Sequence, residues 1–299
     1  MNSPTEPSTN AAPHLPLDAR TLIDRYGVRA KKSWSQNFLV DPRTYRAIVS
    51  ACQLSEQDTA VEIGAGLGTL TSHLLLTGAQ VIAVERERDM CAILQRELGA
   101  EPRLRLLTAD ALQLKLNELL PDEGTEAERR LVVVGNLPYQ IASPLLFQLL
   151  AQRMIVRRIV VMIQREVADR LLASVGTDAY SSMSAQVQML ARVEHVCHVG
   201  RGAFIPAPRV ESTVVRLIPY ATSAVPVRSL NNYATVVRAG FGQRRKMLRN
   251  SLAAQLNPAA MAALEACGID LSRRAETLSL SEFARLADAL PDEAVSELR

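Results

Sequence analysis

The stretch "TAVEIGAGLGTLT", residues 59–71, decides the fold class of this chain of 299 residues. Residues 59–64 are nearly continuous in apolar character, as expected for a parallel strand that is covered on both faces. Gly64, Gly66 and Gly68 follow, and a helical pattern occupies 69–77. Glycines between a strand and a helix allow a tight turn and close approach of the backbone to a ligand. The stretch predicts the first strand–turn–helix unit of an α/β fold that binds a ligand.

The same rhythm continues along the chain. Further Val/Ile/Leu-rich runs alternate with helical patterns. The runs lie at 80–85, 104–110, 130–136 and 158–164, and the helical patterns lie at 87–98 and 143–152. This alternation predicts a doubly wound parallel sheet of Rossmann type, in which ligands bind beyond the carboxyl ends of the strands. Helices around 165–173 and 182–192 then precede two apolar runs, "VEHVCHV" (193–199) and "STVVRLIPY" (212–220). We expect these runs to close the sheet as an antiparallel strand pair.

The spacing of the glycines favours S-adenosylmethionine (SAM) over a dinucleotide, because the dinucleotide motif has one more residue before its third glycine. Glu85 ends the second strand, where a carboxylate can accept both ribose hydroxyl protons. Asp110 ends the third strand, where it can accept from the adenine amine. Either acid alone is more often a solvated strand end. Together with Gly64 and Gly66, the acids at successive strand ends predict a SAM site.

The fourth strand ends in Asn136-Leu137-Pro138-Tyr139. The exocyclic amine of adenine is a poor nucleophile because its lone pair is delocalised into the ring. The Asn136 side-chain oxygen and the Leu137 carbonyl can accept its N–H bonds as the nitrogen becomes tetrahedral, while Pro138 fixes the backbone and Tyr139 stacks on the base. An isolated motif of this kind could simply be a turn that caps the next helix. At the fourth strand of a SAM-type sheet, it favours adenine amine methylation.

Net charge, cysteine spacing and the lack of long apolar runs limit the expected partners and location. A net charge of +3 does not by itself indicate a nucleic-acid binder, and the four cysteines are far apart, so we expect no metal site and a reducing, cytoplasmic location. We expect neither a signal peptide nor a membrane span, because residues 1–20 lack a basic segment followed by an apolar one and no run of about 18 apolar residues occurs. We expect a disordered tail over 1–19, a SAM-dependent methyltransferase domain over 20–220, and a small all-helical RNA-binding domain over 221–299.

Several motifs occur in an order that resembles one enzyme family: "SQNFL" (35–39), "EIGAGLG" (62–68), "NLPY" (136–139), "MIQREVADRL" (162–171), "AFIPAPRVESTVVRL" (203–217) and "FGQRRKMLRNSL" (241–252). Over about residues 20–290 the chain resembles the KsgA/RsmA-type small-subunit (16S) rRNA adenine N6,N6-dimethyltransferases. It departs from the family pattern at Trp34, Ser35 and Ala65, where Leu, Gly and Pro are usual. These departures put local loop geometry in doubt more than activity.

The resemblance implies roles for single residues. SAM would be contacted by Gln36, Asn37, Leu39, Gly64, Glu85, Asp110 and Asn136. Phe204 would stack on the target base opposite Tyr139, although a core Phe before a proline turn is an equally good interpretation of its sequence context. Arg244, Arg245, Lys246 and Arg249 form a basic cluster that would contact RNA phosphates without selecting a sequence, although a solvated helix face is an equally good interpretation of the cluster taken alone. A second basic stretch lies in residues 20–46.

The resemblance also implies the biological substrate. It implies dimethylation of two adjacent adenosines in a loop near the 3′ end of 16S rRNA, late in assembly of the small ribosomal subunit, on a subunit precursor. The sequence does not reveal the oligomeric state, and we expect a monomer. Three alternatives remain: a 23S rRNA or DNA adenine methylase, an RNA-binding assembly factor on a methylase fold, and a nicotinamide dehydrogenase. The dehydrogenase is the weakest, because no hydride-transfer acid accompanies the glycine loop.

Overall fold

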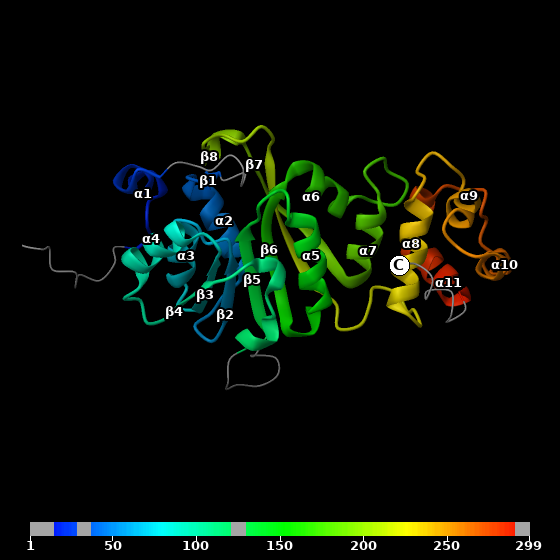
Figure 1. The fold of residues 1–299 in the computed structure, drawn as a ribbon, viewed down its shortest axis with the longest axis horizontal. Coiled ribbons are helices and arrows are strands. Elements are labelled where there is room, and N and C mark those ends of the chain that lie inside the picture. The colour runs from blue at the N-terminus through cyan, green and yellow to red at the C-terminus, as the bar shows by residue number, and fades with distance from the viewer. Residues whose placement is uncertain (1–14, 29–36, 121–129, 291–299) are drawn as a thin grey trace, which may run out of the picture. The chain divides into compact units, whose positions relative to one another are not determined.

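A computed structural model describes residues 15–28, 37–120 and 130–290 of the chain (Figure 1). By their contacts, the described residues group into two compact units. The first comprises the parts up to residue 148 together with 155–163 and 196–216. The second comprises 149–154, 164–195 and the chain from 217 onward. Residues 164–195 thus group with the C-terminal helices, and the domain boundary expected at residues 220 and 221 stays a prediction.

One sheet of seven strands has the order β4-β3-β2-β5-β6-β9-β7. The strands are β2 (Thr59–Ile63), β3 (Gln80–Glu85), β4 (Leu104–Thr108), β5 (Leu131–Asn136), β6 (Val156–Gln164), β7 (Ala191–Val199) and β9 (Ser212–Pro219). The pairs β2–β3, β3–β4, β2–β5 and β5–β6 are parallel. The Rossmann-like sheet and its first strands are therefore confirmed to within about two residues at each end. Strands β9 and β7 are neighbours at one end of the sheet, as expected.

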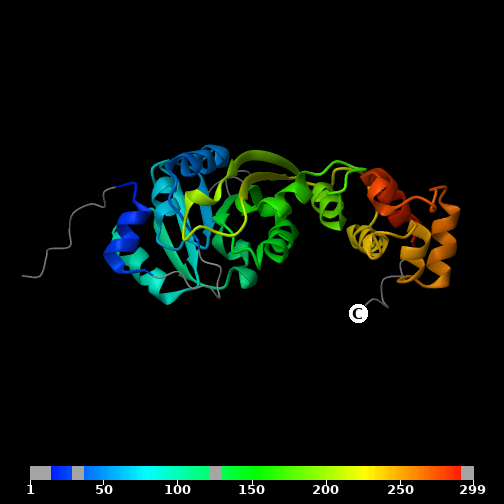
Figure 2. The same cartoon turned by 90° about the horizontal axis from the view of Figure 1, so that it is seen from above.

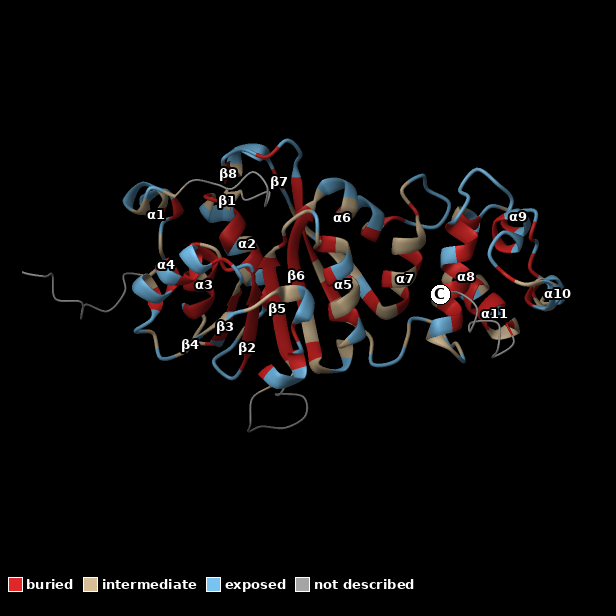
Figure 3. Ribbon diagram, in the orientation of Figure 1, coloured by how far each residue is buried: buried red, intermediate tan, exposed pale blue. Residues whose placement is uncertain are grey.

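The central strands are buried on both faces, which explains their nearly continuous apolar character (Figure 3). One face packs through residues such as Val132 and Val134 against α2 (Pro42–Cys52), α3 (Thr69–Leu75) and α4 (Arg88–Leu98). The alternate residues Val61, Val133 and Val161 are also fully buried. Because the side chains alternate between faces, helices or loops must cover the second face as well. Helix α5 (Ala142–Ala151) follows β5.

The N-terminal part of the first unit begins before the expected boundary at residue 20. Residues 1–14 of the expected tail lie outside the described residues, but Leu17 donates its N–H to Ser72 Oγ at 2.9 Å, and Asp18 caps helix α1 (Ala19–Tyr26). Tyr26 Oη donates to Glu97 Oε1 at 2.5 Å and holds α1 beside α4, as both views show (Figure 2). The packed chain therefore starts by residue 17.

The second unit is helical apart from the ends of the strands that it shares with the sheet. Its helices are α6 (Arg165–Leu172), α7 (Ser182–Leu190), α8 (Leu230–Phe241), α9 (Leu248–Ala253), α10 (Pro258–Ala266) and α11 (Leu280–Ala289). Tyr233, Phe241 and Phe283 lie at the centre of its apolar core. No strand occurs between residues 221 and 290, the part of the expected helical domain that the structure describes.

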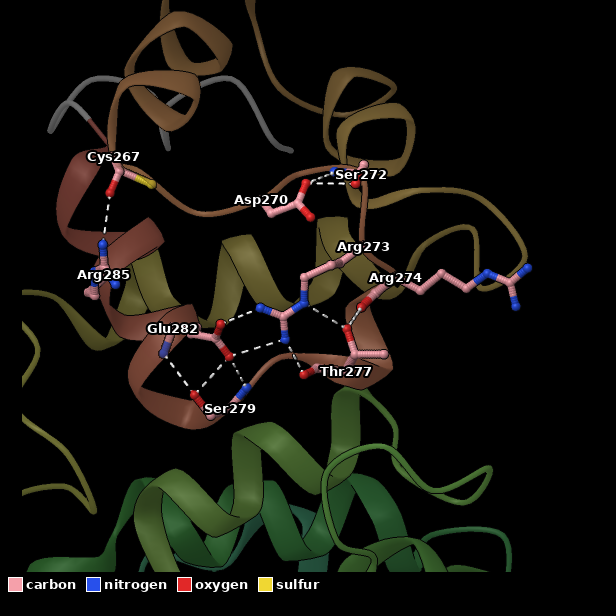
Figure 4. A network of polar contacts seen from close by, with 9 residues as sticks. All are labelled: Cys267, Asp270, Ser272, Arg273, Arg274, Thr277, Ser279, Glu282 and Arg285. Carbon is pink, nitrogen blue, oxygen red and sulfur yellow. Dashed lines mark hydrogen bonds and ion pairs between the residues drawn. The ribbon is translucent and has the colours of Figure 1, made fainter.

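A polar network fixes the start of α11 (Figure 4). Ser279 caps the helix and forms a capping box with Glu282, whose carboxylate also pairs with the guanidinium of Arg273. The pair with Arg273 lowers the pKa of Glu282 below its usual value. The backbone N–H groups of Ser279 and Glu282 are thus each met by a side chain, which stabilises the start of α11.

Candidate active site

A cavity of about 430 Å³ lies in the first unit, within the size range of small-molecule sites. It lies at the carboxyl ends of the strands where the chain order of the sheet reverses, between β2 and β5. Open α/β sheets bind ligands at such a switch point. The predicted residues that line it are Asn37, Leu39, Gly64, Gly66, Glu85, Asp110, Asn136, Leu137, Pro138 and Tyr139. Gln36 lies outside the described residues.

The glycine loop forms one wall of this cavity. Gly64, Gly66 and Gly68 have φ values of +73°, +55° and +78°, a left-handed conformation that side chains disfavour. The Gly64 N–H donates to the Val84 carbonyl at 2.8 Å, which ties the loop to the end of β3. Ala65, the departure from the family pattern, is buried and also lines the cavity. The loop therefore keeps its tight turn with Ala65 in place.

Two carboxylates stand at the ends of neighbouring strands. Glu85 Oε2 accepts the Gly66 N–H at 2.8 Å, and its Oε1 accepts the N–H of Arg86 at 2.7 Å and of Glu87 at 2.8 Å. Asp110 Oδ1 accepts the Leu112 N–H at 3.0 Å. These bonds fix both carboxylates and leave further lone pairs for the hydroxyl and amine donors of an adenosine group. Two carboxylates that can accept from hydroxyl and amine groups at one end of the cavity fit the adenosine part of SAM.

Asn136 occupies the end of β5 in a defined orientation. Its side-chain Nδ2 donates to the Asn37 carbonyl at 3.3 Å, so Oδ1 is the side-chain atom left to accept from a ligand. The preceding residue, Gly135, lies so close to β2 that a Cβ atom would be 2.4 Å from the Ile63 carbonyl oxygen. Glycine is required there because β2 and β5 approach closely, and this approach places Asn136 at the cavity.

The two predicted aromatic residues differ in their placement. Tyr139 lines the cavity, and its hydroxyl is 3.1 Å from Ser212 Oγ. Phe204 does not line the cavity; it is 3% exposed and belongs to the apolar core. It lies in β8 (Phe204–Ile205), opposite Leu39 of β1 (Phe38–Leu39). The structure thus brings Tyr139 to the cavity but not Phe204, whose stacking role stays a prediction.

Some cavity residues had no distinct sequence signal. The buried Tyr45 hydroxyl donates to the Leu39 carbonyl and lies 2.7 Å from Thr69 Oγ1, so it joins β1 to the start of α3. Burial raises the pKa of Tyr45, which keeps the hydroxyl protonated. A tyrosine within an amphipathic helix pattern is ordinarily a core residue, and only the fold reveals this bridging contact.

Glu62 is a second such residue. It is 1% exposed, lines the cavity, and accepts the Thr71 hydroxyl at 2.5 Å. Burial raises the pKa of Glu62 to about 8, the Thr71 bond opposes this rise, and the charge of Glu85 adds to it. Glu62 lies inside the apolar run of 59–64, where nothing in the local pattern marks this acid as part of a cavity wall.

The basic cluster after α8 is exposed, but its members differ in their contacts. Arg244 Nη2 donates to the Asp178 carbonyl at 2.7 Å, and Arg249 Nη2 lies 3.5 Å from Glu265 Oε1. Within the described part of the chain, the side chains of Arg245 and Lys246 make no hydrogen bond or ion pair. These two cations are the ones available to an external phosphate.

Residues 27–292 match the family model for ribosomal RNA adenine dimethylase. The chain belongs to this family. A ribosomal RNA small subunit methyltransferase A from Pseudomonas savastanoi pv. phaseolicola (strain 1448A / Race 6) is 41% identical over 276 residues, covering 92% of this chain and all of that protein. The protein of the same description from Anaeromyxobacter dehalogenans (strain 2CP-C) is 45% identical over 278 residues, covering 91% of this chain and 97% of that one.

A crystal structure of a dimethyladenosine transferase from Plasmodium falciparum matches this structure with a TM-score of 0.68. It is 25% identical, and the match covers 83% of this chain and 95% of that one. Family membership confirms the resemblance carried by the motifs, and with it an enzyme that uses SAM as methyl donor. None of the helices in the described ranges has the length and apolar character needed to cross a membrane.

Proposed function

We propose that this dimethylase transfers methyl groups from SAM to the N6 amines of two adjacent adenosines in a loop near the 3′ end of 16S rRNA. The observation that carries this proposal is the orientation of Asn136 at the cavity. Its Nδ2 is held by the Asn37 carbonyl, so that Oδ1 is presented as an acceptor. An acceptor fixed at the end of β5 is what an adenine amine needs when it attacks a methyl group.

SAM, when bound, supplies an electrophilic methyl group on a sulfonium sulfur. Glu85 and Asp110 would hold the adenosine of SAM. The glycine loop would contact the part of SAM beside the adenosine. Asn136 Oδ1 and the Leu137 carbonyl accept the two N–H bonds of the target amine, which directs the nitrogen lone pair out of the ring plane. Tyr139 stacks on the base, and Pro138 holds the turn between these groups. The amine proton leaves as positive charge develops on nitrogen, so no strong base is needed before attack.

The RNA is held by charge rather than by sequence. Arg245 and Lys246, with Arg244 and Arg249 beside them, contact phosphates and position a loop whose target base is unstacked. We infer that the substrate is a precursor of the small subunit, that the enzyme acts late in its assembly as a monomer, and that this takes place in the cytoplasm. The names of the relatives, which refer to the small ribosomal subunit, support this substrate over 23S rRNA.

Transfer of labelled methyl from SAM to small subunits that lack these methyl groups tests the proposal directly. The RNA is digested to nucleosides, and we expect N6,N6-dimethyladenosine from 16S rRNA and none from 23S rRNA or DNA. Label in 23S rRNA or DNA alone would assign a different substrate. Binding to the subunit without any transfer would instead favour the assembly-factor alternative.

Asn136→Ala tests the assigned chemistry. The variant should bind SAM with modest loss but lose most methyl transfer, because its oxygen matters most as the amine becomes tetrahedral. Loss of one positioned acceptor of this kind typically costs about a hundredfold or more in rate. Asn117→Ala, which removes an exposed amide away from the cavity, serves as the matched control. Unchanged turnover in Asn136→Ala would refute the role of this residue.

A further inference from the structure

The side chain of Tyr139 is restrained at both of its ends. At the backbone end, the Ile141 N–H donates to the Pro138 carbonyl at 3.1 Å and closes a turn that contains Tyr139. At the other end, the Tyr139 hydroxyl and Ser212 Oγ form a hydrogen bond with an O···O distance of 3.1 Å. The backbone and the phenol group are thus both held, which leaves the ring little freedom to turn.

Ser212 comes from a distant part of the chain. It is the first residue of β9 and lies 73 positions after Tyr139. Ser212 is 1% exposed, so its hydroxyl needs a partner inside the protein, and Tyr139 supplies one. The next residue, Thr213, is equally buried but points to the opposite face of the strand, where its Oγ1 lies 3.3 Å from His198 Nδ1. Of these two hydroxyl groups, that of Ser212 is the one that contacts a cavity residue.

The orientation of the Tyr139 ring matters for a base that enters the cavity. The described cavity lining has three aromatic residues, Phe38, Tyr45 and Tyr139. Tyr45 is buried and bonded to β1, and Phe38 packs against an apolar cluster from α1 and α4. Tyr139 is partly exposed and belongs to the same turn as Asn136, which would hold the target amine. Stacking depends on the tilt and offset of the two rings, so the orientation of Tyr139 sets the plane of the base.

We infer that Ser212 is a positioning residue whose hydroxyl fixes the Tyr139 ring in the orientation on which the target adenine stacks. This inference rests on the proposed function, because it takes Tyr139 as the surface that receives the base. Ser212 itself does not touch the substrate. Its hydrogen bond removes, before the RNA binds, rotational freedom that the ring would otherwise lose on binding. A base held in one plane keeps its amine directed at the methyl group.

A double-mutant cycle tests this pair through methyl transfer by the full-length protein to small subunits that lack these methyl groups. Ser212→Ala should lower kcat/KM about three- to tenfold, the loss expected when one side chain is no longer restrained before binding. Tyr139→Phe should cause a similar loss, because the ring remains but its hydroxyl is gone. The double variant should lose no more than either single variant, because each substitution alone already breaks the bond.

Two controls separate this role from a general disturbance of the strand or of the cofactor site. Thr213→Val removes the neighbouring buried hydroxyl and keeps the shape of the side chain, and it should transfer methyl like the unaltered protein. Calorimetric titration with S-adenosylhomocysteine should give the same affinity for Ser212→Ala and the unaltered protein, because the pair acts on the target base.

The inference is overturned if the losses from Ser212→Ala and Tyr139→Phe multiply in the double variant, because the two hydroxyl groups would then act independently. Turnover of Ser212→Ala at the unaltered rate would also overturn it. So would an equal loss in Thr213→Val, or weaker binding of S-adenosylhomocysteine by Ser212→Ala, since the effect would then come from the strand or the cofactor site. If the unaltered protein itself transfers no methyl to 16S rRNA, the proposed function fails, and the inference fails with it.

Discussion

Replacement of Glu62 by Gln should remove a large part of the pH dependence of stability. Glu62 is 1% exposed, and burial raises its pKa from a reference of 4.5 to about 8. A raised pKa in the folded state means that folding favours the protonated carboxyl. The stability that this group contributes is complete below pH 4.5 and is lost as the pH rises through 8. Glutamine keeps an oxygen for the Thr71 hydroxyl but does not ionise.

The magnitude follows from the interval between the two pKa values. Between the reference and the folded value, the free energy of unfolding falls by about 1.4 kcal/mol for each pH unit. From about pH 5 to about pH 7.5, with partial titration at both ends, the loss from this single group is about 3 kcal/mol. Glu62→Gln should therefore gain about 3 kcal/mol over the unaltered protein across this range.

Urea unfolding followed by circular dichroism at several pH values measures this gain as a difference between two proteins. Glu118→Gln is the matched control, because the Glu118 side chain is 64% exposed and its removal should leave the pH dependence unchanged. If the stability curves of Glu62→Gln and the unaltered protein stay parallel from about pH 5 to about pH 7.5, the burial argument is refuted.

Four further substitutions test the roles of single residues. Gly135→Ala should lower the unfolding free energy by about 3 kcal/mol and reduce methyl transfer, measured by thermal melting and turnover, because the new Cβ would meet the Ile63 carbonyl. Tyr45→Phe should cost about 1 kcal/mol in stability and raise the KM for SAM more than it lowers kcat, because the Leu39 carbonyl loses its donor. Arg245→Ala should weaken rRNA binding and its salt dependence at an unchanged melting temperature, whereas Arg244→Ala should also lower that temperature by breaking its bond to the Asp178 carbonyl.

The sequence by itself determined the class of fold and most of the cavity wall. The strands at 59–64 and 80–85, the glycine loop, and the acids Glu85 and Asp110 were all found from local patterns, and all contribute to the cavity as expected, although Asp110 lies two residues beyond the end of β4. Such patterns are sufficient because apolar runs, glycine conformations and strand ends depend on residues near one another in the chain. Parallel strands then bring their carboxyl ends together, whatever the details of packing.

The tertiary structure alone decided which side chains meet. It joined Asn136 to the Asn37 carbonyl, Tyr45 to β1, and Tyr139 to Ser212, and it placed Phe204 in the core. Each of these outcomes depends on the order of strands in the sheet and on the packing of helices against it. Residues far apart in the chain contribute to that packing, so a local sequence pattern specifies which groups reach the edge of the sheet, and the packing of the whole unit specifies their partners.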